Sequence, residues 1–80
     1  MHTVERLEEA LALVSRLGYT IRQDCLGGRG GGCELKGRKL FFLDLDLGPD
    51  EQLEQVLATL RSEPSVGELP VSAELAELLK

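Results

Sequence analysis

The chain is poor in the residues that build metal, redox and base-stacking sites. Its 80 residues include one histidine, two cysteines, no tryptophan and only 4% aromatic residues. Two thiols are too few for a disulfide scaffold. A zinc site needs four ligands, and we do not expect the single histidine, His2, to be one of them. The shortage of aromatic rings also removes the usual stacking platform for single-stranded nucleic acid. We therefore expect no metal and no cofactor.

Long apolar runs and an excess of positive charge are missing as well. No stretch approaches the roughly 20 apolar residues of a membrane span, and no signal peptide is recognisable, so we expect a cytoplasmic protein. The formal net charge of -5, from 14 acidic and 9 basic residues, makes nucleic acid and anionic membranes unfavourable partners. With 42% hydrophobic and 29% charged residues, residues 1–80 are expected to form one small domain with one core.

The first segment has the pattern of an amphipathic helix. Apolar residues recur at three- and four-residue steps over residues 3–17. They include Val4, Leu7, Leu11 and Val14. Thr3 can cap the free amide groups at the start, and Gly18 offers a left-handed stop. The sequence therefore predicts a helix over residues 3–17.

Three strands and their connections follow this helix. The period changes to two over residues 19–25, which predicts a half-buried strand. Residues 26–32 contain five glycines and predict a loop. Further strands are predicted over residues 33–36 and 39–47, with a tight turn at residues 37–38 between them. Three short consecutive strands favour a three-stranded antiparallel meander.

The remaining residues carry helical signals. Pro49 stands in a first turn, with Asp50 and Glu51 behind it, and an apolar stripe continues to about Arg61. A loop is predicted over residues 62–70, after which Ser72 can cap a short final helix. The resulting order, α-β-β-β-α-α, predicts an α+β fold, a two-layer sandwich with the helices packed on one face of the sheet.

The third predicted strand is apolar on both faces. Phe41 and Leu43 lie on one face, and Leu40 and Phe42 begin the opposite one. Exposing a Leu and a Phe side by side forfeits about 1.5–3 kcal/mol each relative to burial. Either residues 69–79 fold back over them and the chain is a monomer, or a second chain covers them across a two-fold axis. We expect self-association as a homodimer, because so short a chain commonly gains stability from a partner.

Basic residues gather between positions 22 and 39. Five basic residues against two acidic ones give this segment a net charge of +3, which leaves -8 for the rest of the chain. The glycines of residues 26–32 lack the following helix and the Gly-Lys-Ser/Thr motif of phosphate-binding loops, so we interpret them as a flexible hairpin connection. Arg29, Arg38 and Lys39 could still hold a carboxylate or phosphate weakly.

Cys25 and Cys33 flank the glycine loop. A seven-residue connection between antiparallel strands can place the two thiols opposite each other across the ladder. Three roles are then open: two small buried hydrophobes, a cross-strand disulfide, or half of a metal site shared between two chains. The C-x7-C spacing departs from the spacing of zinc knuckles, which favours the buried thiols.

No residues combine into a catalytic constellation. The serines lie at predicted helix ends or in the loop after the second helix, and no histidine is placed to act as their base. Asp44 and Asp46 stand two apart on one strand face, as some magnesium ligands do. Alternation along a strand produces the same spacing without any metal. We therefore do not expect an enzyme.

The sequence favours a binding protein over a catalyst. We expect a small non-catalytic α+β protein that self-associates through Leu40 and Phe42 and presents its glycine-rich basic hairpin to an anionic or protein partner. The alternative, from a different class, is a thiol redox or metal-handling protein that uses Cys25 and Cys33.

Overall fold

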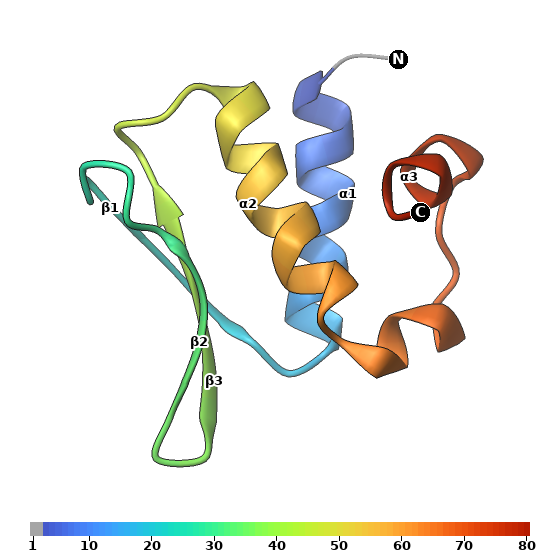
Figure 1. Cartoon of the computed structure of the whole chain (residues 1–80), viewed down its shortest axis with the longest axis horizontal. Coiled ribbons are helices and arrows are strands. Elements are labelled where there is room, and N and C mark those ends of the chain that lie inside the picture. Colours follow the sequence, from blue (N-terminus) through green and yellow to red (C-terminus); the bar gives the residue numbers. More distant parts are fainter. Residues whose placement is uncertain (1–2) are drawn as a thin grey trace.

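The computed structural model describes residues 3–80, so His2 lies outside the described residues. Along the chain the elements are α1 (Thr3–Arg16), β1 (Thr20–Asp24), β2 (Gly31–Leu35), β3 (Arg38–Asp44), α2 (Pro49–Arg61), the 3-10 helix η1 (Pro64–Glu68) and α3 (Ala73–Leu78) (Figure 1). The predicted α+β class and the predicted order of helices and strands are confirmed. None of the helices within residues 3–80 is long and apolar enough to cross a membrane.

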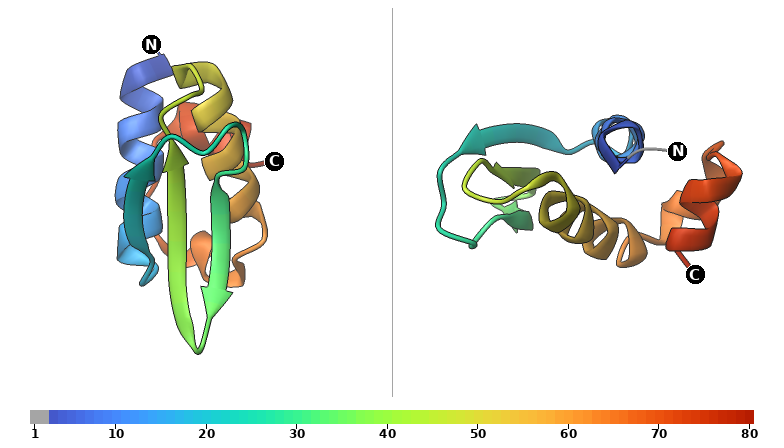
Figure 2. Two further views of the ribbon diagram at one scale, coloured as in Figure 1. Left: turned by 90° about the vertical axis from the view of Figure 1, so that its left-hand side faces the viewer. Right: turned by 90° about the horizontal axis from the view of Figure 1, so that it is seen from above.

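The sheet is mixed, and the predicted antiparallel meander is wrong in one pairing. β3 lies in the middle of the strand order β1-β3-β2. β2 pairs with β3 antiparallel, as predicted, but β1 pairs with β3 in parallel. The connection between the two parallel strands, residues 25–37, includes β2 and is long enough for a crossover. The glycine loop carries the chain across the end of β3 instead of turning back beside β1 (Figure 2).

The limits of two strands also differ from the prediction. β2 begins within the glycine run at Gly31, and the tight turn uses Lys36 and Gly37, with φ of 53° and 78°. Two left-handed residues make the turn type that matches the twist of a hairpin. β3 ends at Asp44, because its carboxylate accepts the backbone N–H of Asp46 at 2.9 Å and turns the chain out of the strand. As a result, Leu45, which would continue the face of Phe41 and Leu43 in a strand over residues 39–47, is 49% exposed.

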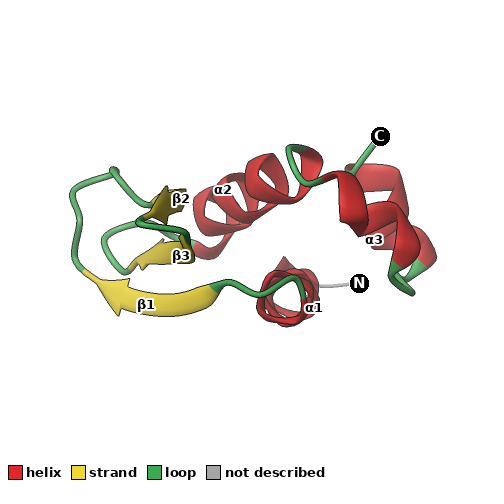
Figure 3. Ribbon diagram, turned by 90° about the horizontal axis from the view of Figure 1, so that it is seen from below, coloured by secondary structure: helices red, strands yellow, loops and turns green. Residues whose placement is uncertain are grey.

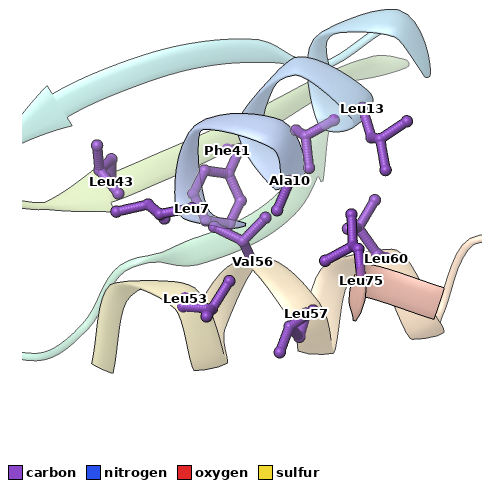
Figure 4. Packing of buried hydrophobic residues seen from close by; sticks show 11 residues of the cluster. Leu7, Ala10, Leu13, Phe41, Leu43, Leu53, Val56, Leu57, Leu60 and Leu75 are labelled. Carbon is purple, nitrogen blue, oxygen red and sulfur yellow. The ribbon is translucent and has the colours of Figure 1, made fainter. Parts of the chain in front are cut away.

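α1 and α2 pack side by side on one face of the sheet and form the core with it (Figure 4). Phe41 and Leu43 of β3 point toward these helices, and Ile21 of β1 lies beside Phe41 in the parallel register. The buried hydrophobic residues are Leu7, Ala10, Leu13, Val14, Phe41, Leu43, Leu53, Val56, Leu57, Leu60 and Leu75. The helical spacing predicted for residues 3–17 therefore supplies one wall of the core.

α3 docks on the helices and not on the sheet. Ser72 caps α3 by accepting the N–H of Leu75 at 3.2 Å. The carboxylate of Glu9 in α1 in turn accepts the Ser72 N–H at 2.8 Å and the Ser72 hydroxyl at 2.7 Å. α3 thus lies on the far side of the helices from the strands (Figure 3). The C-terminal segment does not cover Leu40 and Phe42, and the described chain leaves that face of the sheet open.

Candidate functional site

The glycine-rich loop donates backbone hydrogen bonds to two carboxylates of its own chain, those of Asp44 and Asp46. Asp44 is fully buried and accepts hydrogen bonds from the backbone N–H groups of Leu26, at 2.9 Å, and Gly28. Asp46 accepts the N–H of Gly27 at 2.9 Å. Gly28 has a φ of 91°, which favours glycine. A phosphate-binding loop would offer such N–H groups to a ligand, but here they already donate to carboxylates of the same chain.

Asp44 anchors this end of the sheet as an ionised group. Burial raises the pKa of Asp44, but the N–H groups of Leu26, Asp46 and Gly28 outweigh it and hold the pKa below its ordinary value of 3.8. Gln52 of α2 donates from Nε2 to the Asp44 carbonyl at 2.9 Å, which ties the helix to the same point. Within residues 3–80, no three His, Cys, Asp or Glu side chains gather to hold a metal ion.

Close packing against α2 and β3 explains two further glycines of the loop. A Cβ atom at Gly32 would lie 2.8 Å from Cγ2 and 2.9 Å from Oγ1 of Thr59. A Cβ atom at Gly30 would lie 2.5 Å from the carbonyl oxygen of Phe42. The segment thus differs from the flexible hairpin connection that we expected: it joins strands that are not paired, and hydrogen bonds and packing fix its path.

The structure does not bring Arg29, Arg38 and Lys39 together. Arg29 lies in the glycine loop beside the end of β3, whereas Arg38 is the first residue of that strand. Lys39 follows Arg38 and points to the opposite face, where its Nζ lies 3.2 Å from Oε2 of Glu63 and 5.4 Å from the ring centre of Tyr19. Burial, and then the charge of Glu63, raise the pKa of Tyr19. The three predicted anion contacts therefore form no common site.

Cys25 and Cys33 do not face each other. The expected ladder between them required β1 and β2 to be paired, but β3 lies between these strands. Cys33 pairs with Leu40, whereas Asp24, the residue before Cys25, pairs with Asp44. Four residues along β3 correspond to about 13 Å, and two strand spacings add about 10 Å across the sheet. This exceeds the roughly 7 Å between Cα atoms that a disulfide allows, and both thiols are exposed, not buried as favoured.

The thiol of Cys25 is also poorly suited to redox chemistry. The charge of the neighbouring Asp46 carboxylate, and a hydrogen bond to it, raise the pKa of Cys25. Reactive cysteines need the opposite environment, because the thiolate is the nucleophile and the metal ligand. No feature around Cys25 favours the thiol alternative.

The most distinctive surface is the face of the sheet turned away from α1 and α2. Two residues of β3, Leu40 and Phe42, are half-buried there, and Leu35 of β2 is 58% exposed. A hollow of about 490 Å³ lies over them, within the range of ligand sites. We call the following residues of its lining the open-face patch: Leu35, Leu40 and Phe42 as the apolar floor, and Arg22, Lys36 and Arg38 as the basic rim.

Strand pairing assembles the open-face patch from three segments. Arg22 of β1 lies beside Phe42 in the parallel register, and Leu35 of β2 lies opposite Arg38. The only acidic residue of the lining is Asp24, at the end of β1. Leu40 and Phe42 were expected on this face from the sequence, whereas Arg22 and Leu35 were not. The alternation of the strands assigns each residue a face, but only the strand order shows which residues are neighbours.

Comparisons with known proteins add no relative. No protein-family model, no curated protein and no solved structure matches this chain. Function is therefore inferred from the geometry and charge of the open-face patch.

Proposed function

We propose that this chain is a small non-catalytic binding protein whose contact surface is the open-face patch, and that its partner is an acidic amphipathic helix of another protein. The observation that carries the proposal is a 490 Å³ hollow with an apolar floor and basic residues around it, on a chain whose overall charge is -5. Apolar surface supplies affinity in such contacts, and a charged rim supplies selectivity.

The floor of the hollow has apolar area left to bury. Leu35 is 58% exposed, and Leu40 and Phe42 are half-buried. Since full burial of a Leu or Phe contributes about 1.5–3 kcal/mol, covering the remaining area contributes about 1 kcal/mol for each side chain. An occupant with two or three apolar side chains along one side can cover this remaining apolar area and gain the corresponding binding free energy.

The size of the face favours a single helix over a folded domain. Three strands spaced about 4.8 Å apart and about six residues long make a footprint of about 14 by 20 Å. Stable protein interfaces bury about 800 Å² on each partner, well above this footprint of roughly 300 Å². An α-helix about 10 Å across fits the width of the face, and about 13 residues span its length.

The rim favours an acidic occupant over a second copy of the same face. Face-to-face pairing through Leu40 and Phe42 would set the basic rim of one copy against that of the other, which is unfavourable. Glutamates flanking the apolar stripe of a helix would instead lie near Arg22, Lys36 and Arg38. The acidic residues of α1 and α2 lie on the other side of the sheet. Their charges act little on an occupant of the open face, because salt at physiological concentration screens charges beyond about 8 Å.

The proposal is tested with a labelled peptide of about 13 residues that carries leucines on one helical stripe and glutamates elsewhere. We expect saturable binding, measured by fluorescence anisotropy, that weakens at least tenfold with Phe42→Ser or Arg38→Glu. Val4→Ser and Arg16→Glu are the matched controls, because Val4 is 50% exposed, Arg16 is exposed, and both lie on α1. These two variants should bind as the wild type does.

Two further binding measurements, with a lysine peptide and with lipid vesicles, distinguish the acidic helix from other occupants. The same peptide with lysine in place of glutamate should bind at least tenfold more weakly. Equal binding of the two peptides, or no loss with Phe42→Ser, would refute the proposal. Binding to vesicles of phosphatidylserine and phosphatidylcholine that is lost with Phe42→Ser, without binding of the acidic peptide, would assign the patch to a membrane surface instead.

A further inference from the structure

β1 is an edge strand whose outer side is unpaired. It pairs with β3 on one side, and no strand of residues 3–80 lies on the other (Figure 2). Four of its five residues, Thr20, Arg22, Gln23 and Asp24, are exposed. The strand contains no proline or lysine, which proteins commonly use to protect such an edge. Its backbone groups are available to another strand.

We infer that two copies of this chain associate by antiparallel pairing of their β1 strands, with the two-fold axis at Gln23. The inference does not depend on what the open-face patch binds. It places self-association at the edge of the sheet, whereas the sequence pointed to the face that carries Leu40 and Phe42.

The direction of the backbone groups limits the possible registers. The carbonyl of Asp24 accepts the N–H of Leu45 at 2.8 Å, so it points toward β3. Because backbone groups alternate along a strand, those of Gln23 and Ile21 point outward. In a symmetric antiparallel pair, residues whose backbone groups point outward lie opposite one another. One residue of β1 therefore lies on the two-fold axis, directly opposite the same residue of the other copy.

Charge selects one of these registers. With Gln23 on the axis, Arg22 of each copy lies opposite Asp24 of the other. With Arg22 or Asp24 on the axis, that residue faces its own copy and like charges meet. With Ile21 on the axis, Arg22 faces Thr20 and no opposite charges pair. Opposite charges in directly facing positions stabilise a sheet, and like charges destabilise it. The order Arg-Gln-Asp is thus self-complementary about its central residue.

The geometry of this register favours close contact of the charged side chains. Gln23 forms the hydrogen-bonded pair on the axis, so Arg22 and Asp24 occupy the non-hydrogen-bonded positions, where Cα atoms are only about 4.5 Å apart. Both side chains belong to the same face, since Arg22 lies beside Phe42 and Asp24 beside Asp44 in the parallel register. The pairing would form one six-stranded sheet and join the two open-face patches into one surface.

A charge swap tests this inference, with no peptide present. Sedimentation from about 1 to 100 µM covers the affinity range of modest interfaces. The wild type should dimerise, and Arg22→Glu or Asp24→Lys alone should weaken the dimer by about tenfold or more, because two attractive pairs become repulsive. The double variant should restore the dimer, and an equimolar mixture of the two single variants should form heterodimers.

Three controls separate this interface from the alternatives. Circular dichroism of each variant should match that of the wild type. Phe42→Ser should leave the dimer intact, whereas a dimer lost with Phe42→Ser and kept with Arg22→Glu would locate the contact at the open face. A wild type that stays monomeric over the whole range, or a double variant that stays as weak as the single ones, would overturn the inference. Neither result bears on peptide binding by a monomer.

Discussion

One added carbon at Gly32 tests whether the glycine-rich loop is dictated by packing against α2. A Cβ atom there would lie 2.8 Å from Cγ2, 2.9 Å from Oγ1 and 3.4 Å from Cβ of Thr59, which is itself only 7% exposed. Gly32→Ala must therefore displace α2 or distort β2. Thr59→Ala removes both close atoms and leaves an ordinary contact. The two substitutions should be strongly coupled.

The expected magnitude follows from two opposing contributions. Overpacking of this kind costs about 1–3 kcal/mol. Replacing Gly by Ala where the backbone tolerates it stabilises by about 0.4–1 kcal/mol, through the unfolded state, and Gly32 is not among the glycines with positive φ. Gly32→Ala should therefore lower the free energy of unfolding by about 1–2 kcal/mol in the wild type, yet raise it by about 0.5 kcal/mol in the Thr59→Ala background.

Urea unfolding followed by circular dichroism measures both effects. The free energy of unfolding falls by about 1 kcal/mol per molar urea. Gly32→Ala should therefore lower the urea midpoint of the wild type by about 1–2 M and raise that of the Thr59→Ala variant slightly. Gly67→Ala is the matched control, because Gly67 has open space around it and no positive φ, so its midpoint should not fall. If Gly32→Ala lowered the urea midpoint equally in the wild type and in the Thr59→Ala variant, or lowered it in neither, the packing explanation would be refuted.

Three further predictions concern titratable groups. Because the folded pKa of Asp44 is depressed, its contribution to stability is complete above the unfolded value near 3.8 and is lost as the pH falls through the folded pKa; Asp44→Asn should therefore flatten the acid side of the stability profile measured by urea unfolding. The thiol of Cys25 should react with iodoacetamide more slowly than free cysteine, and Asp46→Asn should accelerate the reaction, because the carboxylate raises the thiol pKa. Glu63→Gln should lower the pKa of Tyr19, read from phenolate absorbance, since the Glu63 charge raises it; an unchanged value would contradict the assigned contact.

Local patterns predicted the elements of the fold but not the pairing of its strands. The apolar spacing of residues 3–17 and the Pro49 start of α2 were sufficient to place both main helices. The parallel pairing of β1 with β3 was not predictable in this way, because alternation defines the faces of a strand and not its neighbours. The end of β3 at Asp44 was not predictable either, because the carboxylate that turns the chain at Asp46 also binds N–H groups of a loop that lies 16 and 18 residues away in the sequence.

The candidate site was predicted only in part for the same reason. Leu40 and Phe42 stand out because a single strand cannot bury both of its faces in a small two-layer domain. Arg22 and Leu35 join them through the mixed sheet, which the expected meander does not describe. Lys39 was grouped with Arg38 from adjacency in the sequence, although neighbours on a strand point to opposite faces.

The open-face patch is tested most directly by amide chemical shifts recorded while the acidic amphipathic peptide is titrated into the labelled protein. The account predicts that the largest changes fall on Arg22, Leu35, Leu40 and Phe42, across all three strands, and that α1 and α2 change little. Changes concentrated in residues 27–32, or on the helices, would contradict the assignment of the open face as the binding surface.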